Sequence, residues 1–322
     1  MNRRKYLKAA AAVPAAAVLA QTGLARASGW PEREITLING FAPGGATDLT
    51  SRAIAEVLGR KLGATIIVKN VPGGAGTLGP AQLAAAKPDG YTIGLIGSSS
   101  IVASPHLMNV PYRPWESFEL IAQVAEFRYG LGVGADSPVR TLEDFIALGR
   151  SRQVTFASTS PTNLTSMYRL GKLTGANFRW IVFKGEVDSV AQAVGGHVDA
   201  CLQSATGMIP QIEAGKLRLI ASASDDRWTE YPDVKTIREH GFDAATRGPL
   251  GYAVPAGTDP AIRARLQDAI EASLADPELQ QQFRNLGVVG KYRSGADFQA
   301  LLKSMEPDIH EVLKENNLLK KS

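Results

Sequence analysis

The chain has 322 residues, of which 44% are hydrophobic and 20% are charged, and its formal net charge at pH 7 is +4. No repeat or low-complexity tract occurs, and the single cysteine excludes a disulfide framework within one chain. The length allows two hydrophobic cores, so we expect two domains.

Residues 1–27 have the pattern of a cleavable export signal, with a basic start, an alanine-rich apolar middle and small residues before the cleavage point. Arg3 and Arg4, followed by Tyr6, resemble the twin-arginine type, and a general secretory signal is the alternative. Cleavage after Ala27 removes five basic residues, so the net charge becomes +4 minus 5, or −1. We therefore expect a soluble periplasmic protein of a Gram-negative bacterium, with no basic stripe for nucleic acid.

Residues 35–91 predict two strand–turn–helix units. Ile35 to Phe41 is a short apolar run, and Asp48 to Leu62 carries apolar residues at helical spacing, so Ala42 to Thr47 is the turn. Gly44 and Gly45 let this turn bend sharply and expose its backbone amides. These amides and the free N–H groups of the first helical turn favour a carboxylate or a phosphate. We therefore expect an anion site at this turn.

Apolar runs and helical patterns continue to alternate as far as Ala221. Such alternation predicts an α/β fold with doubly wound sheets. Cys201 lies in the apolar run VDACL, which favours a small buried side chain. After Gly251 the pattern becomes mostly helical, with segments at Pro260–Leu274, Glu278–Leu286 and Ala296–Leu313.

Several blocks, in the same order along nearly the whole chain after residue 30, carry a resemblance to a known family. They include FAPGGATD, LGATIIVKNVPGGAGTLG, AAAKPDGYTI, VFKGEVDSVAQAVGGHVDA and GYAVPAGTDPAIRARL. These blocks resemble the Bug receptors, the TctC-like extracytoplasmic solute-binding proteins of tripartite tricarboxylate transporters. The resemblance implies two doubly wound α/β domains facing a ligand cleft, as in type II periplasmic binding proteins, with a C-terminal helical segment.

The same resemblance implies where the chain crosses between domains. Crossings are expected near Glu126–Tyr129 and near Ala244–Gly251. Domain 1 would then contain residues 28–127 and 248–322, and domain 2 would contain residues 128–247. Both crossings are short and lie beside apolar runs, which suits hinges.

Four loops that follow predicted strands are expected to meet at the carboxyl ends of the sheets, where open α/β folds bind ligands. The resemblance places the PGG-xx-D loop on the cleft, which implies ligand contacts from Ala42, Gly44, Gly45, Thr47 and Asp48. Asp48 has an alternative role as a helix cap or a first-turn acid.

The second loop contributes Ser98 and Ser99 as candidates. The third loop stands where the family has a turn rich in glycine and serine, and its candidates are Ser158, Thr159, Ser160, Thr162 and Asn163. Here hydroxyl residues and Pro161 replace some of the glycine, so hydroxyl donors survive while one amide is lost and the loop is stiffer. Simple capping of the following helix is the alternative role.

The fourth loop, Phe183-Lys184-Gly185, resembles the family's Tyr-Lys-Gly and makes Lys184 and Gly185 candidates. Gln203 is a candidate where the family often has an acid, and a neutral amide repels an anionic ligand less. Arg128 at the predicted hinge is a candidate counter-charge, and Arg247 is a weaker one. Ordinary surface exposure is the alternative for the three charged residues.

A competing interpretation is an exported enzyme that holds a phosphate-containing ligand in its glycine-rich loops. Gly74 to Gly79 matches the dinucleotide pattern GxGxxG, but the pattern starts late after its strand and lacks the acid expected on the next strand. The four histidines have no metal-ligand spacing, and no serine lies in GxSxG. We therefore expect no enzyme activity, no metal and no cofactor.

The function predicted from these observations is capture of a small carboxylate by closure of two domains, followed by delivery to a tripartite tricarboxylate transporter. The expected partners are TctA-like and TctB-like membrane subunits, and the expected oligomeric state is a monomer. A periplasmic sensor that passes its closed state to a signalling partner is a further alternative.

Overall fold

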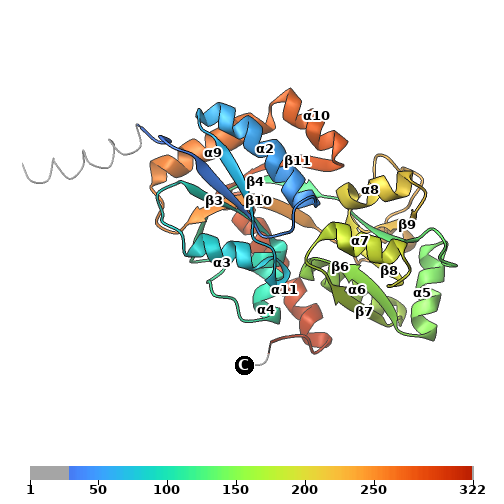
Figure 1. Ribbon diagram of the computed structural model, residues 1–322. Helices are drawn as coiled ribbons and strands as arrows, with labels where there is room; N and C mark the ends of the chain where they lie inside the picture. Colours follow the sequence, from blue (N-terminus) through green and yellow to red (C-terminus); the bar gives the residue numbers. More distant parts are fainter. Residues whose placement is uncertain (1–28, 321–322) are drawn as a thin grey trace, which may run out of the picture.

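The computed structural model of the chain describes residues 29–320. The predicted export signal therefore lies outside the described residues. Figure 1 shows two lobes, each built around its own sheet, with blue, cyan and orange elements in the first lobe and green and yellow elements in the second. No helix in residues 29–320 is both long enough and apolar enough to cross a membrane.

The first sheet has six strands in the order β11-β4-β10-β3-β1-β2. Strands β1, β2 and β3 are parallel, whereas β10 runs antiparallel to β3 and β4, and β11 runs antiparallel to β4. The strands are β1 Ile35–Asn39, β2 Ile66–Asn70, β3 Thr92–Gly97, β4 Phe118–Phe127, β10 Gly248–Pro255 and β11 Val288–Ser294.

Helices cover both faces of this sheet. Neighbouring residues of a strand point to opposite faces, and here apolar residues point to both. Leu37 of β1 packs into one core with Ile54 and Leu266, whereas its neighbour Ile38 packs into a second core with Phe298. The first core belongs to α2 Ala46–Leu62, α9 Pro260–Leu274 and α10 Pro277–Asn285. The second belongs to α3 Leu78–Ala84, the helical segments Ser99–Ala103 and Ser104–Leu107 (α4), and α11 Gly295–Glu315.

The second sheet has five strands in the order β7-β6-β8-β5-β9, with β6 parallel to β7 and β8 and β5 antiparallel to β8 and β9. Phe145 and Leu170 fill the core on one face, and Met208 and Trp228 fill the core on the other.

Cys201 is buried in β8, as predicted, and burial raises the pKa of its thiol to about 12. The elements are β5 Tyr129–Gly134, α5 Leu142–Ser151, β6 Val154–Ser158, α6 Pro161–Thr174, β7 Phe178–Val182, α7 Glu186–Val194, β8 Ala200–Ser204, α8 Ala205–Glu213 and β9 Leu217–Ser222.

The strands of the first sheet come from residues 35–127 and 248–294, and those of the second come from residues 129–222. The chain therefore leaves the first sheet after β4 and returns to it at β10. The predicted domain limits, residues 28–127 with 248–322 and residues 128–247, stay a prediction.

The chain after Gly251 differs from the sequence prediction in one respect. The three predicted helices are present as α9, α10 and α11, but the strand β10 precedes α9 and the strand β11 lies between α10 and α11. Both strands pair with β4, which places the last part of the chain within the first sheet.

Candidate ligand-binding site

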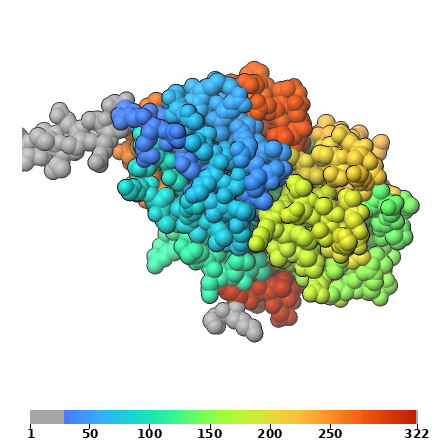
Figure 2. Space-filling model, in the orientation of Figure 1, coloured from blue at the N-terminus to red at the C-terminus, as the bar shows by residue number. Residues whose placement is uncertain are grey.

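A cavity of about 60 Å³ lies between the two lobes, at the carboxyl ends of strands β1, β3, β6 and β8. A buried water needs roughly 10–15 Å³ on this measure, so the cavity suits a few waters or a small organic molecule. On the face seen in Figure 2, blue and cyan atoms of the first lobe meet yellow-green atoms of the second lobe directly. The two lobes are therefore in contact on this face.

Three of the four loops predicted to converge line the cavity, and the fourth, Phe183-Lys184-Gly185, lies beside it and leads directly into the lining residue Glu186. Predicted site residues that line the cavity are Ala42, Gly45, Thr47, Ser98, Ser99, Thr159, Ser160, Thr162 and Gln203. Predicted residues outside the lining are Gly44, Asp48, Arg128, Ser158, Asn163, Lys184 and Gly185. Ligand contact by any residue of either group stays a prediction.

Asp48 fixes the turn between β1 and α2. Its carboxylate accepts hydrogen bonds from the backbone N of Gly44 at 2.9 Å and from Nδ2 of Asn70 at 2.9 Å, and it forms an ion pair with Arg52 at 3.0 Å. Burial opposes ionisation, but the bonds from Arg52, Gly44 and Asn70 outweigh it and lower the pKa of Asp48. This arrangement fits the alternative role of a first-turn acid, and it holds the turn in place for Gly45 and Thr47.

The loop between β6 and α6 gathers hydroxyl groups. Ser160 is the N-cap of α6, and its Oγ accepts from the backbone N of Thr162 at 3.2 Å and lies 2.9 Å from Oγ1 of Thr162. Thr162 Oγ1 lies 3.5 Å from Oγ of Ser98 in the first lobe. Hydroxyl groups from both lobes therefore meet at one wall of the cavity.

Ser158 and Asn163 support this wall from behind. Asn163 is fully buried, and its Nδ2 donates to the carbonyl of Leu202 at 2.8 Å and to Oγ of Ser158 at 2.9 Å. These bonds tie the start of α6 to β6 and to the neighbouring strand β8. The two side chains thus position the hydroxyl loop without lining the cavity themselves.

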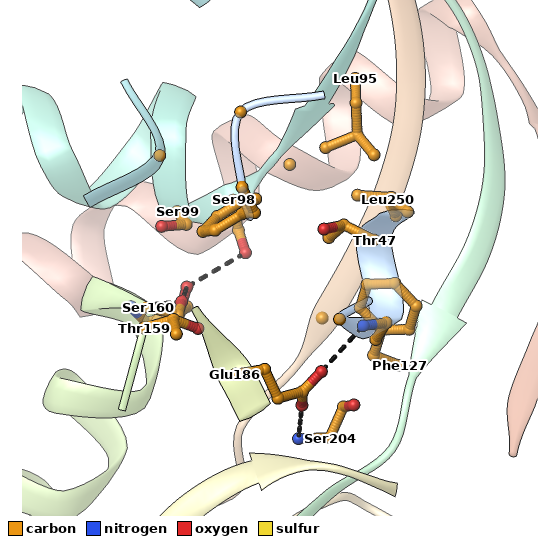
Figure 3. Close-up of a pocket in the computed structure, with 18 of the residues that line it drawn as sticks. Thr47, Leu95, Ser98, Ser99, Phe127, Thr159, Ser160, Glu186, Ser204 and Leu250 are labelled. Carbon is orange, nitrogen blue, oxygen red and sulfur yellow. Dashed lines mark hydrogen bonds between the residues drawn. The ribbon is translucent and has the colours of Figure 1, made fainter. Parts of the chain in front are cut away.

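Glu186 lines the cavity, and sequence reasoning missed it. It is the first residue of α7 and is only 8% exposed. Its Oε2 accepts from the backbone N of Ala46 at 2.8 Å, and its Oε1 accepts from the backbone N of Ser204 at 2.9 Å (Figure 3). These amides belong to the starts of α2 and α8, so the carboxylate sits where three helices begin, which favours an anion. The available signal was an acid directly after the fourth predicted loop.

Burial raises the pKa of Glu186, while hydrogen bonds from Ser204 and Ala46 act in the opposite direction. Burial, together with the nearby charge of Glu186, also raises the pKa of Tyr129, another lining residue. The Tyr129 phenol is therefore protonated at neutral pH.

The predicted counter-charges are engaged elsewhere. Arg128 forms an ion pair with Glu230 at 2.8 Å and donates to the carbonyl of Gly287, and Arg247 pairs with Asp225 at 3.0 Å. Lys184 is exposed and lies outside the lining. Within residues 29–320, no lysine, arginine or histidine lines the cavity.

Glycines of the GxGxxG pattern serve close packing. A Cβ on Gly76 would lie 2.6 Å from the ring of Phe41, and a Cβ on Gly79 would lie 2.7 Å from Cα of Gly40. The strand β2 ends at Asn70, before the pattern, and the helix that follows has only seven residues. This is not the strand–turn–helix context that a dinucleotide site requires. Residues 29–320 contain no cluster of three potential metal ligands among His, Cys, Asp and Glu.

Two α/β lobes with a small cavity between them, at the carboxyl ends of their strands, are the architecture of two-domain periplasmic binding proteins. Residues 50–318 match the family described as tripartite tricarboxylate transporter family receptor, TctC. The chain belongs to this family. Its members are solute-binding receptors, so the enzyme interpretation is not supported.

Individual relatives agree with this assignment. A Cupriavidus necator protein, described as UPF0065 protein in gbd 5'region, is 30% identical over 97% of this chain and 98% of its own length. The solved structure of periplasmic binding protein BugD is 28% identical, with a TM-score of 0.84 over 91% of this chain and 100% of that chain. MatC from Rhodopseudomonas palustris with bound malate is 25% identical, with a TM-score of 0.81 over 88% of this chain and 100% of that chain. The predicted fold class and Bug resemblance are confirmed.

Proposed function

We propose that this receptor captures a small carboxylate in the periplasm by closure of its two lobes and delivers it to a tripartite tricarboxylate transporter. The observation that carries the proposal is the cavity between the lobes, with hydroxyl groups of Ser98, Ser160 and Thr162 at one wall. Hydroxyl donors from both lobes suit a carboxylate, and a ligand that contacts both lobes favours the closed form. MatC, a structural relative, has malate bound.

The energetics require closure as well as anion contacts. A helix start contributes on the order of 0.3–2 kcal/mol to an anion, whereas micromolar affinity needs about −8 kcal/mol. Burial of the ligand's apolar part against Leu95, Phe127 and Leu250, together with hydrogen bonds from the hydroxyl groups, supplies the remainder. In this proposal, the crossings near Glu126–Tyr129 and Ala244–Gly251 act as hinges.

Delivery completes the proposed cycle. The closed form presents one continuous surface across both lobes, and TctA-like and TctB-like membrane subunits recognise that surface. Export through the twin-arginine route and action as a monomer belong to the same proposal.

A thermal-shift screen of the purified full-length chain tests carboxylate capture. The panel holds small mono-, di- and tricarboxylates, amino acids, nucleotides and nicotinamide cofactors. A ligand at a hundred times its Kd stabilises the native state by about 2.7 kcal/mol, so one class of small acid is expected to raise Tm by several degrees. A shift with nucleotides or cofactors alone would contradict the proposal.

Matched serine variants locate the site in the same screen. Ser98→Ala removes a hydroxyl from the cavity wall, whereas Ser151→Ala removes an exposed hydroxyl at the end of α5. The shift is expected to shrink in S98A and to persist in S151A. Equal shifts in the two variants would place the bound acid outside this cavity.

A further inference from the structure

Capture of a carboxylate does not explain why the cavity contains a buried acid, Glu186. The amides of Ala46 and Ser204 come from different lobes and converge on one position, at 2.8 and 2.9 Å from the Glu186 carboxylate oxygens. Such a pair of helix starts is suited to a ligand carboxylate. In this receptor the Glu186 side chain occupies that position (Figure 3).

The cavity has no positive side chain to balance this acid. Glu186 is the only charged side chain that lines it, as far as residues 29–320 show. Buried charges are costly unless they meet an opposite charge or sufficient hydrogen bonds. Each further carboxylate in the same small space therefore adds repulsion against Glu186.

Glu186 nevertheless has acceptor capacity left. Each carboxylate oxygen accepts about two hydrogen bonds, and the backbone amides of Ala46 and Ser204 take one on each oxygen. The remaining lone pairs suit an ammonium group, which offers three donors and the missing positive charge. At the other wall, the hydroxyl groups of Ser98, Ser160 and Thr162 suit a carboxylate.

We propose that Glu186 makes this receptor selective for small aminocarboxylates, with the ligand ammonium at Glu186 and the ligand carboxylate at the Ser98–Ser160–Thr162 hydroxyl wall. This inference rests on the proposed capture of a carboxylate and specifies its ligand class. A zwitterion adds no net charge to the cavity and balances the buried acid locally. A dicarboxylate adds two negative charges and finds one of its two anion positions already filled.

Calorimetric titration of the purified full-length chain at pH 7.5 tests the selectivity. The probes are valine and 4-aminobutanoate as zwitterions, butanoate as a monoanion and succinate as a dianion. At least one zwitterion is expected to bind about 30-fold or more tightly than succinate and butanoate, which is the scale of a buried charge pair. Succinate binding equal to or tighter than both zwitterions would overturn the inference while leaving carboxylate capture intact. Binding by none of the four probes and by no acid in the thermal screen would overturn the proposed function itself.

Three variants separate charge selection from a structural role. Glu186→Gln removes the charge at nearly constant shape, and Glu186→Ala also frees the amides of Ala46 and Ser204 for a second ligand carboxylate. Asp188→Asn is the matched control, because Asp188 is an exposed acid in the first turn of the same helix and lies outside the lining.

Both Glu186 variants are expected to weaken zwitterion binding by about 30-fold, and E186A is expected to gain succinate binding. D188N is expected to match the wild-type order of affinities. A gain of binding cannot result from misfolding, so the succinate titration of E186A is informative even if that variant is less stable. Zwitterion affinities unchanged in E186Q, or absence of any succinate gain in a folded E186A, would overturn the inference.

Discussion

Glu239 is an exposed carboxylate with a dense set of donors. Its oxygens accept from Arg227 at 2.8 and 2.9 Å and from the backbone N of Thr236 at 2.8 Å. The bonds from Arg227, followed by the bond from Thr236, lower the pKa of Glu239 from 4.5 to about 2. A group whose pKa is lower in the folded state stabilises the fold above its unfolded pKa, and this contribution is lost as pH falls through the folded pKa.

We predict that Glu239→Gln lowers the free energy of unfolding at pH 7, and that the difference from wild type shrinks as pH falls from 4.5 toward 2. Urea unfolding of both proteins at stepped pH values measures this difference. Glu34→Gln, which changes an exposed acid in the first lobe, serves as the control. A difference that stays constant between pH 7 and pH 3 would show that the Glu239 carboxylate is not held in its ionised form.

Whether a side chain's hydrogen-bond partners are near or far in the sequence explains which site residues could be predicted from the sequence. Ser160 and Thr162 bond to each other within one loop, so this loop has a recognisable local pattern. Glu186 is defined by Ala46, which lies 140 residues away, and by Ser204 on another strand. From sequence alone it resembles any acid in the first turn of an amphipathic helix.

At the scale of single elements, α5 shows how a local pattern sets a boundary. Thr141 is its N-cap, and Thr141 Oγ1 accepts from the backbone N of Asp144 at 3.1 Å. Asp144 in turn accepts from the backbone N of Thr141 at 3.1 Å, which completes a capping box. Phe145 and Ile146 of the same helix are buried in the core of the second lobe.

We predict that Thr141→Ala destabilises the fold by about 1 kcal/mol, because it leaves a helix-start N–H without its side-chain acceptor. Thr141→Ser retains the hydroxyl and is expected to stay close to wild type. Equilibrium urea unfolding measures both variants. Since Thr141 lies outside the cavity lining, ligand affinity in T141A should not change. Equal stability of T141A and wild type would mean that the capping box contributes nothing.

Helices and strands with a clear apolar periodicity were predicted well. Two strands, β10 and β11, were missed because their sequences lack such a pattern. The helix α2 and the strand β1 combine apolar periodicity with a glycine turn between them. The strand β10 contains Pro249, Gly251 and Pro255, residues that disfavour strands, and tertiary pairing with β3 and β4 outweighs that tendency. The strand β11, VVGKYRS, is largely polar and half-exposed, so its apolar pattern is weak.

At the scale of the whole molecule, polar contacts hold the lobes together around the cavity. Besides the Glu186 bonds, Oγ1 of Thr206 donates to the carbonyl of Leu286 at 2.6 Å, and Lys172 of α6 pairs with Glu315 of α11 at 2.5 Å. Polar contacts of this kind can exchange with water at modest net free energy. Leu164 of α6 also packs into the first-lobe core that contains Phe298, so separation of the lobes would expose apolar surface at Leu164 as well as break these polar contacts.

The turn after β1 and the loop before α7 approach closely enough to be joined covalently. A Cβ on Gly185 would lie 3.2 Å from the Cβ of Ala42. Disulfides have Cβ–Cβ distances of about 3.5–4.5 Å, so a small shift accommodates the bond. Gly185 has φ of −133°, which any residue can adopt. The buried Cys201 thiol, with its pKa of about 12, does not compete for oxidation.

We predict that an oxidised A42C/G185C variant is locked closed and binds slowly, because the ligand must enter while the lobes are apart. Stopped-flow association of the tightest-binding acid from the thermal screen should slow by at least about tenfold on oxidation, in proportion to the lost open population. Reduction should restore association to the rates of the two single variants, since the reduced pair forms no bond across the cleft. The single variants A42C and G185C control for the added side chains and should not respond to oxidant. If the oxidised double variant associates as fast as its reduced form, ligand exchange does not require separation of these two loops, and capture by lobe closure is wrong.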